Sequence, residues 1–336
     1  MKRQNASLGL IRGGLAVLLG TLLASPSGAF AATSVTAGDL PTVIKGIDVV
    51  GVPASQVGAL LQLLGLKEGM QVPYRRLKEA VVTPAEAKLE GTGRFREISV
   101  RPTTFIGGSE DGATYLTISV VDRSSHRAKA APRAARELPS AVVAFFDERV
   151  RGLGAFRDTL LPSDQDRLED LAERHAAALE AALDASQPEI RARAAQAIAF
   201  LPDSRQARRL LEGALLDPDA GMRRDVARAL LPLVERQIGR EPIALEPYLA
   251  LIRLPESADR MNAASLLLRL ARIPEGRAPI IREAGAPLLA MAKMKHPGER
   301  TLALEALQVL SQAPAPKSWD EYRNWWEKAS AQRFAE

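Results

Sequence analysis

Three histidines are the side chains of this chain best suited to metal binding or to proton transfer near neutral pH. They are His126, His175 and His296, and none of them has a partner at the spacing of a metal-binding motif. His175 follows Glu173, but positions i and i+2 of a helix point to different faces. The sequence therefore predicts no catalytic residue, no metal site and no cofactor.

The motifs of common hydrolases and phosphate-binding loops are also missing. The chain contains no G-x-S-x-G, no H-E-x-x-H and no cysteine, so a cysteine nucleophile and a thiolate metal site are excluded. Gly91-Thr92-Gly93 precedes a predicted strand and so cannot offer phosphate a helix N-terminus. Acidic pairs such as Glu169-Asp170 are common on solvated helices. A hydrolase or polysaccharide-modifying enzyme that uses scattered carboxylates is kept as the alternative to a non-catalytic protein.

The first 31 residues have the order of features typical of an export signal. Lys2, Arg3 and Arg12 precede an uncharged run from Gly13 to Ala24, and Ala29-Phe30-Ala31 supplies the small residues of a cleavage site. A retained membrane anchor is the alternative, but the apolar run is shorter than the roughly 20 residues that cross a bilayer. We expect residues 1–31 to be a signal peptide and the mature chain to be periplasmic or secreted, with no transmembrane span.

Removing that segment leaves 42 basic against 40 acidic residues, which does not favour a nucleic-acid partner. The exception is residues 123–137, a basic stretch that contains Ala, Ser and Pro and separates two regions of different pattern. The basic residues of this stretch are Arg123, Arg127, Lys129, Arg133 and Arg136. A solvated linker explains them, and contact with anionic lipid or cell-wall polymer is the alternative.

Residues 42–122 alternate between strand and helix patterns and predict a small α+β module in the order β-α-α-β-β. The predicted elements are a strand at 43–51, a helix at 56–64, a helix at 74–91 that Thr83-Pro84 kinks or breaks, and strands at 95–104 and 114–121.

This module resembles a POTRA domain. The resemblance covers about 80 residues and rests on Ile47-x-Val49-x-Gly51, Leu66-Lys67-Glu68-Gly69, the run from Leu89 to Phe95, and the closing Leu116-Thr117-Ile118-Ser119-Val120. It implies a periplasmic module that binds other polypeptides, often by adding a strand at the edge formed by the second strand of this order. No run of barrel-forming strands follows, so the membrane-insertion role of barrel-linked members is not carried over.

Pro102 independently marks that second strand as an edge, because proline lacks the N–H that a central strand needs. Main-chain pairing along this strand would bind an extended partner with little demand on its sequence. Alternation also predicts that Ile98 and Val100 face the helices as core. The predicted binding residues here are Arg96, Glu97, Ile98, Ser99, Val100 and Arg101.

Residues 138–312 predict an all-α solenoid, because one pattern of Ala, Leu and Arg occurs four times. The stretch that begins at Glu189 is repeated 32 residues later from Gly221, and weaker copies begin at Asp259 and Glu299. The match around Asp217-Pro218-Asp219 resembles HEAT repeats, which implies that Arg191 and Arg223 pair with the turn aspartate of a neighbouring unit. The candidates for an inner binding face are Arg193, Gln196, Asp225 and Arg228.

Residues 313–336 contain all three tryptophans of the chain, together with Tyr322. A helix that caps the last repeat explains the cluster, and a platform for stacking sugar or peptide is the alternative. Taken together, the sequence predicts a non-catalytic scaffold of the bacterial cell envelope with a protein partner, an envelope or outer-membrane polypeptide. The alternatives are an envelope enzyme and an adaptor at the membrane or wall surface.

Overall fold

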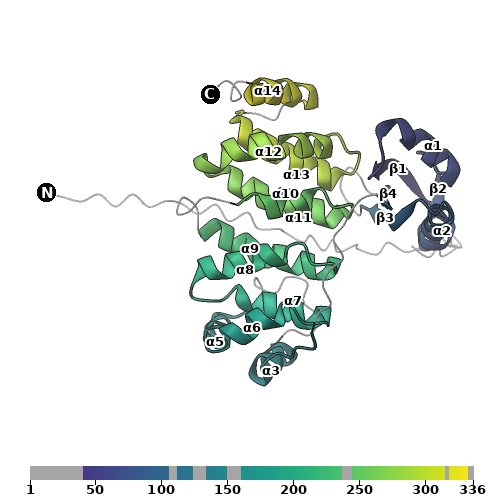
Figure 1. Cartoon of the computed structure of the whole chain (residues 1–336). Coiled ribbons are helices and arrows are strands. Elements are labelled where there is room, and N and C mark those ends of the chain that lie inside the picture. The colour runs from purple at the N-terminus through teal and green to yellow at the C-terminus, as the bar shows by residue number, and fades with distance from the viewer. Residues whose placement is uncertain are drawn as a thin grey trace, which may run out of the picture.

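The computed structural model describes residues 41–105, 112–123, 134–149, 160–236, 244–314 and 318–331. A small sheet with its helices lies beside a larger all-helical region (Figure 1). This arrangement is compatible with the predicted fold class, an α+β module followed by helices. The predicted signal peptide and most of the basic linker lie outside the described residues.

The sheet has the strand order β2-β1-β4-β3. β1 and β4 run parallel, whereas β2 and β3 each pair antiparallel with their neighbour. The elements of this region are β1 (Pro41–Val50), α1 (Ala54–Leu64), β2 (Gln71–Pro73), a 3-10 turn (Tyr74–Arg76), a π-helical turn (Lys78–Val82), α2 (Thr83–Gly91), β3 (Phe95–Thr104) and β4 (Ala113–Asp122).

The predicted order β-α-α-β-β is wrong in one element, because β2 lies between the two helices. β2 has only three residues, too few for an alternating pattern to reveal it. Its single buried side chain is Val72, and its position is set by pairing with the start of β1, about 30 residues away in the chain. A contact over that distance leaves no local signal.

The predicted helix at 74–91 is interrupted where Pro84 disturbs it. Proline lacks an N–H and its ring clashes with the carbonyl four residues earlier, so a regular helix does not continue through it. The chain instead makes the wide turn Lys78–Val82 and begins the regular helix α2 at Thr83, with Pro84 in its first turn. The predicted kink or break at Thr83-Pro84 is therefore a π-helical distortion just before the proline, and the backbone stays helical on both sides of it.

One face of the sheet packs against α1 and α2. Ile44, Leu116 and Ile118 from the strands and Leu89 from α2 are completely buried in this core. α1 ends at Gly65, whose φ of 73° is in the left-handed region that glycine adopts without strain. The helices therefore cover one face of the sheet, whose two edges are formed by β2 and β3.

The regular elements of the second region are helices, apart from an isolated β-bridge between Ala134 and Ala185. Its helices are α3 (Ser140–Arg149), α5 (Pro162–Arg174), α6 (Ala176–Ala182), α7 (Pro188–Ile198), α8 (Ser204–Ala214), α9 (Ala220–Arg236), α10 (Glu246–Ile252), α11 (Ser257–Ala271), α12 (Pro274–Ala292), α13 (Pro297–Ser311) and α14 (Trp319–Ala331). α5 and α6 are separate helices, because the backbone leaves the helical conformation at His175.

The four sequence copies form α7, α9, α11 and α13, which pack in succession. Arg191 of α7 forms a buried ion pair with Asp217 at 2.8 Å, and Arg223 of α9 pairs with Asp259 at 2.6 Å. The predicted role of these two arginines is thus confirmed, although Asp259 lies inside α11 and not in a turn. Arg260 of α11 continues the series with Glu299 of α13 at 2.8 Å.

The same three arginines also fix the turns that precede their own helices. Arg191 donates to the carbonyls of Ala185 and Ser186, and Arg223 donates to those of Asp217 and Pro218. Arg260 repeats this with Leu254 and Pro255. Each guanidinium therefore connects a turn to the next helix. We refer to Arg191, Arg223 and Arg260 with their carboxylate partners as the arginine ladder.

The tryptophan-bearing helix α14 packs against α12 and α13 at one end of the helical region (Figure 1). The indole N–H of Trp319 donates to the Leu289 carbonyl at 2.8 Å, and that of Trp326 donates to the Ile281 carbonyl at 2.9 Å. Tyr322 is completely buried. These contacts engage the polar atoms of two indoles in packing, which fits the interpretation of α14 as a cap.

Candidate interaction surfaces

β3 is the long edge strand of the sheet, ten residues against three for β2 at the opposite edge. The prediction from Pro102 that this strand lies at an edge is therefore confirmed. An unpaired edge presents main-chain N–H and C=O groups that can pair with another chain. All six predicted binding residues from Arg96 to Arg101 lie on β3.

The direction of the main-chain hydrogen bonds alternates along β3, and this determines which residues point their N–H and C=O groups away from β4. The N–H of Phe105 donates to the Ala113 carbonyl at 3.0 Å, so position 105 is directed toward β4. In an antiparallel pair the direction alternates, and the register is unbroken from Glu97 to Thr104. Ser99 and Arg101 are therefore bonded to β4. The main-chain groups of Ile98, Val100, Pro102 and Thr104 point away from it.

Two of those four outward positions lack a free N–H. Pro102 has none, and the N–H of Val100 donates to the Glu86 carboxylate of α2 at 3.1 Å. The side chain of Val100 is buried and that of Ile98 packs partly against the same core, as alternation predicts. Ile98 is thus the position in the first half of β3 whose outward N–H has no hydrogen-bond partner among the described residues.

The sheet contacts the helical region at the turn between α12 and α13. The Asp48 carboxylate accepts hydrogen bonds from the N–H groups of Lys295 at 2.9 Å and His296 at 2.8 Å, at the start of α13. The Lys295 ammonium forms an ion pair with Glu68. The buried ring of His296 lies against those of Phe105 and Tyr115. We refer to these contacts as the junction.

Burial at the junction raises the pKa of the Asp48 carboxyl above its ordinary value, against the two N–H donors that lower it. The opposite holds for Glu68, where the hydrogen bond from Lys295 lowers the pKa of the carboxyl. The two acids of one interface are therefore affected differently, because Asp48 is the more deeply buried.

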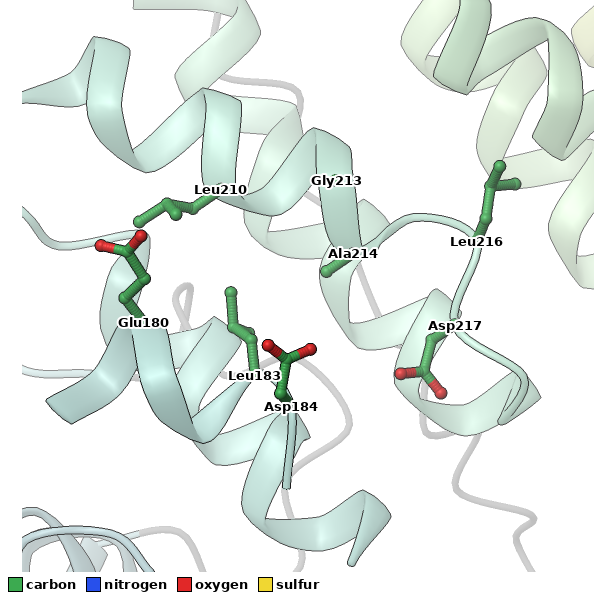
Figure 2. A pocket seen from close by; sticks show the side chains of 8 residues that line it. All are labelled: Glu180, Leu183, Asp184, Leu210, Gly213, Ala214, Leu216 and Asp217. Carbon is green, nitrogen blue, oxygen red and sulfur yellow. The ribbon is translucent and has the colours of Figure 1, made fainter. Parts of the chain in front are cut away.

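A hollow of about 280 Å³ lies between α6 and α8 in the helical region. Figure 2 shows Glu180, Leu183 and Asp184 on one side and Leu210, Gly213 and Ala214 of α8 on the other, with Leu216 and Asp217 in the following loop. Leu216 is 44% exposed. Asp217 belongs to the arginine ladder, whereas the carboxylates of Glu180 and Asp184 form no ion pair within the described residues. The hollow combines apolar side chains with two available acids.

A second hollow, of about 240 Å³, lies between α1 and the start of β3 and is mostly apolar. Leu63 is 49% exposed at this site, and the amide oxygen of Gln56 is buried without a hydrogen-bond partner among the described residues. Phe95 forms part of its lining, so this hollow is close to the first residue of β3.

The four residues predicted for an inner binding face lie on the adjacent helices α7 and α9. Arg193 pairs with Asp147 of α3 at 2.9 Å and stacks over the Phe146 ring, so it has a structural role. Gln196 is half-buried, and Arg228 is exposed. Burial raises the pKa of the Asp225 carboxyl, and the charges of Arg224 and Arg228 oppose this effect.

Sequence reasoning missed Glu86, Asp48 and the two hollows. The separation between Val100 and Glu86 is 14 residues and that between Asp48 and His296 is 248, so no motif spacing could indicate either contact. The exposed leucines at 63 and 216 were indistinguishable from core leucines in the pattern.

Among the described residues, no group of three His, Asp or Glu side chains could hold a metal ion. A search for helices able to cross a bilayer, made over the same residues, finds none of sufficient length and apolarity. No protein-family model matches the chain, and no curated protein matches it.

Proposed function

We propose that this protein is an exported, non-catalytic scaffold of the bacterial cell envelope that binds polypeptide partners. In this proposal the sheet is a POTRA-like module and the helices form a HEAT-like solenoid. The observation that carries the proposal is the edge strand β3, whose outward main-chain groups at Ile98 are not paired with a neighbouring strand of the described sheet. An extended polypeptide supplies the matching donors and acceptors.

The helical region supports the same proposal through the arginine ladder. Its buried ion pairs connect α7 to the turn before α9, α9 to α11, and α11 to α13 with the same chemistry. A series of helices joined in this way offers a long surface and needs no closed catalytic cleft. Candidate contact residues on that surface are Gln196, Asp225 and Arg228, together with the hollow between α6 and α8.

A binding experiment can test the role of the β3 edge with a pair of matched variants. Ile98→Pro removes the outward N–H, and Ile98→Ala shortens the same side chain but keeps that N–H. The full-length mature chain and both variants would be used to capture partners from envelope extracts, with quantification by mass spectrometry. We expect a partner that Ile98→Ala retains and Ile98→Pro loses. Equal recovery by all three proteins would contradict binding through β3.

The hollow between α6 and α8 can be tested in the same extracts. Glu180→Lys with Asp184→Lys reverses the charge at its rim, and Glu169→Lys with Asp170→Lys makes the same change on α5 as a control. A basic partner of the helical region should be lost only from the first variant. A capture profile unchanged by either pair would remove this hollow from the proposal.

Export is tested separately from binding. The proposal predicts that the protein recovered from cells begins at Ala32, which N-terminal sequencing would determine. A chain that retains Met1 and remains in the cytoplasm would contradict the envelope location and leave the binding proposal to be judged by the capture experiments.

A further inference from the structure

The outward positions of β3 differ in which main-chain groups they can offer to a partner strand. Among the described residues, nothing pairs with the outward N–H and C=O of Ile98. Two residues later, Val100 offers only its C=O, because Glu86 accepts its N–H at 3.1 Å. Two residues later again, Pro102 offers only its C=O. The available donors therefore end at Ile98 along the first half of the strand.

We propose that Glu86 and Pro102 restrict strand addition to the first half of β3, so that a partner segment is held in register by its hydrogen bonds to Ile98. This inference rests on the proposed function and specifies its binding site. The partner is an extended segment of another polypeptide whose main chain exchanges hydrogen bonds with Ile98. The next N–H of the partner segment can reach the Val100 carbonyl. No carbonyl of that segment can pair with the Val100 N–H while the Glu86 carboxylate accepts it.

The geometry of α2 explains why Glu86 can perform this role. α2 contacts β3 and continues through a short turn into it, which places Glu86 over the middle of the strand. The Glu86 side chain is half-buried, and its bond to the Val100 N–H is charge-assisted, a class stronger than a bond between neutral groups. A neutral carbonyl from a partner strand would therefore displace this carboxylate at a net loss.

Removing the carboxylate should lengthen the binding site by one donor. In Glu86→Ala the Val100 N–H becomes available, so a partner strand gains a main-chain hydrogen bond that the wild-type protein denies it. Glu86→Gln keeps an acceptor at the same position but without the charge, so its affinity for a partner strand should lie between those of the wild type and Glu86→Ala. Glu90→Ala, one helical turn further along α2 at an exposed position, is the matched control.

The probe is a synthetic peptide with the sequence of β4, residues 113–122, since this segment already pairs with β3 on its inner side. It would be titrated into the ¹⁵N-labelled full-length mature protein and each variant, with amide chemical shifts followed by NMR. We expect the wild-type protein to respond at Ile98. Glu86→Ala should respond at both Ile98 and Val100 and bind about tenfold more tightly, the change produced by one additional net hydrogen bond.

The outcomes separate the two proposals. Shifts at Ile98 with equal affinities for the wild type and Glu86→Ala would overturn the role of Glu86 and leave the β3 edge in place. A peptide that changes no shift on β3 in any variant would instead count against the edge itself. Sedimentation of Glu86→Ala without peptide is the third arm. Its dimerisation would identify a second copy as the occupant and overturn the assignment to another polypeptide.

Discussion

The sheet and the helical region are stabilised over different distances along the chain. In the sheet, β1 pairs with β4 from Val43 and Ala113 onward, so its strands close only after most of the module has been made. In the helical region the arginine ladder joins residues 26, 36 and 39 positions apart and uses the same contact each time. Contacts that recur at a regular spacing can be recognised in the sequence, whereas a single contact between distant residues cannot.

The largest expected effect comes from breaking the ladder in the helical region. Arg223→Ala leaves the Asp259 carboxylate buried, 1% exposed, without its guanidinium and leaves the Asp217 and Pro218 carbonyls without their donor. Loss of one partner of a buried ion pair should lower the free energy of unfolding by about 3 to 5 kcal/mol. Urea unfolding followed by circular dichroism measures it.

The adjacent Arg224→Ala provides the control, since Arg224 is exposed and its ion pair with Asp225 is 3.8 Å long. We expect a change of at most about 0.5 kcal/mol there. Similar losses for the two variants would mean that the ladder contributes no more than a surface pair does.

The second prediction concerns the packing of α14. A side chain at Gly285 would overlap the Trp326 indole, and the buried position leaves the ring little room to move. Gly285→Ala should therefore cost about 1 to 3 kcal/mol, the range for overpacking, and alter the near-ultraviolet circular dichroism of the tryptophans. Gly213→Ala is the matched control. Its added methyl group meets nothing within 4 Å, so this helical position should become slightly more stable.

The smallest predicted effect is at the junction, where the Asp48 carboxylate of the sheet contacts the helical region. Asp48→Ala removes the acceptor for the N–H groups of Lys295 and His296 in the turn before α13, a loss of about 1 kcal/mol for a hydrogen-bonded group. Asp48→Asn retains an acceptor oxygen and should lose less. Calorimetry of both variants would measure the change and show whether the two regions begin to unfold separately.

The pH dependence of the junction follows from the raised pKa of Asp48. Because the folded protein holds this proton more tightly than the unfolded chain does, the contribution of Asp48 to stability falls as pH rises from its ordinary pKa through its raised value. The charged groups around it are Glu68, Lys295, His296 and Glu299. Comparing wild type with Asp48→Asn across this range isolates the carboxyl, since asparagine does not titrate. Parallel stability curves would contradict the assignment.

The sequence predicted those features whose cause is local. Alternation located β3 to the residue, Pro102 identified it as an edge, and the recurring Arg positions located α7, α9, α11 and α13. The partner of Arg191 was also predictable, because the Asp217 turn is part of the repeated pattern. In each case the signal is either a short stretch of sequence or a pattern that recurs at a regular spacing.

The remaining features depend on contacts that no local pattern carries. β2 is specified by pairing with β1, and Glu86 acquires its role only when α2 lies over β3. Arg193 was predicted for a binding face, but its side chain contacts Asp147 and Phe146 of α3. The position of α3 cannot be obtained from the pattern of α7 alone.

The bond between Asp48 and the main chain of His296 spans 248 residues and has a consequence for synthesis on the ribosome. The sheet emerges first and can fold as a unit, since domains generally form in the order of translation. Its aromatic face at Phe105 and Tyr115 then remains uncovered until the turn before α13 has been made. For most of translation this nascent protein carries an incomplete surface, and a chain truncated before residue 295 would display it permanently.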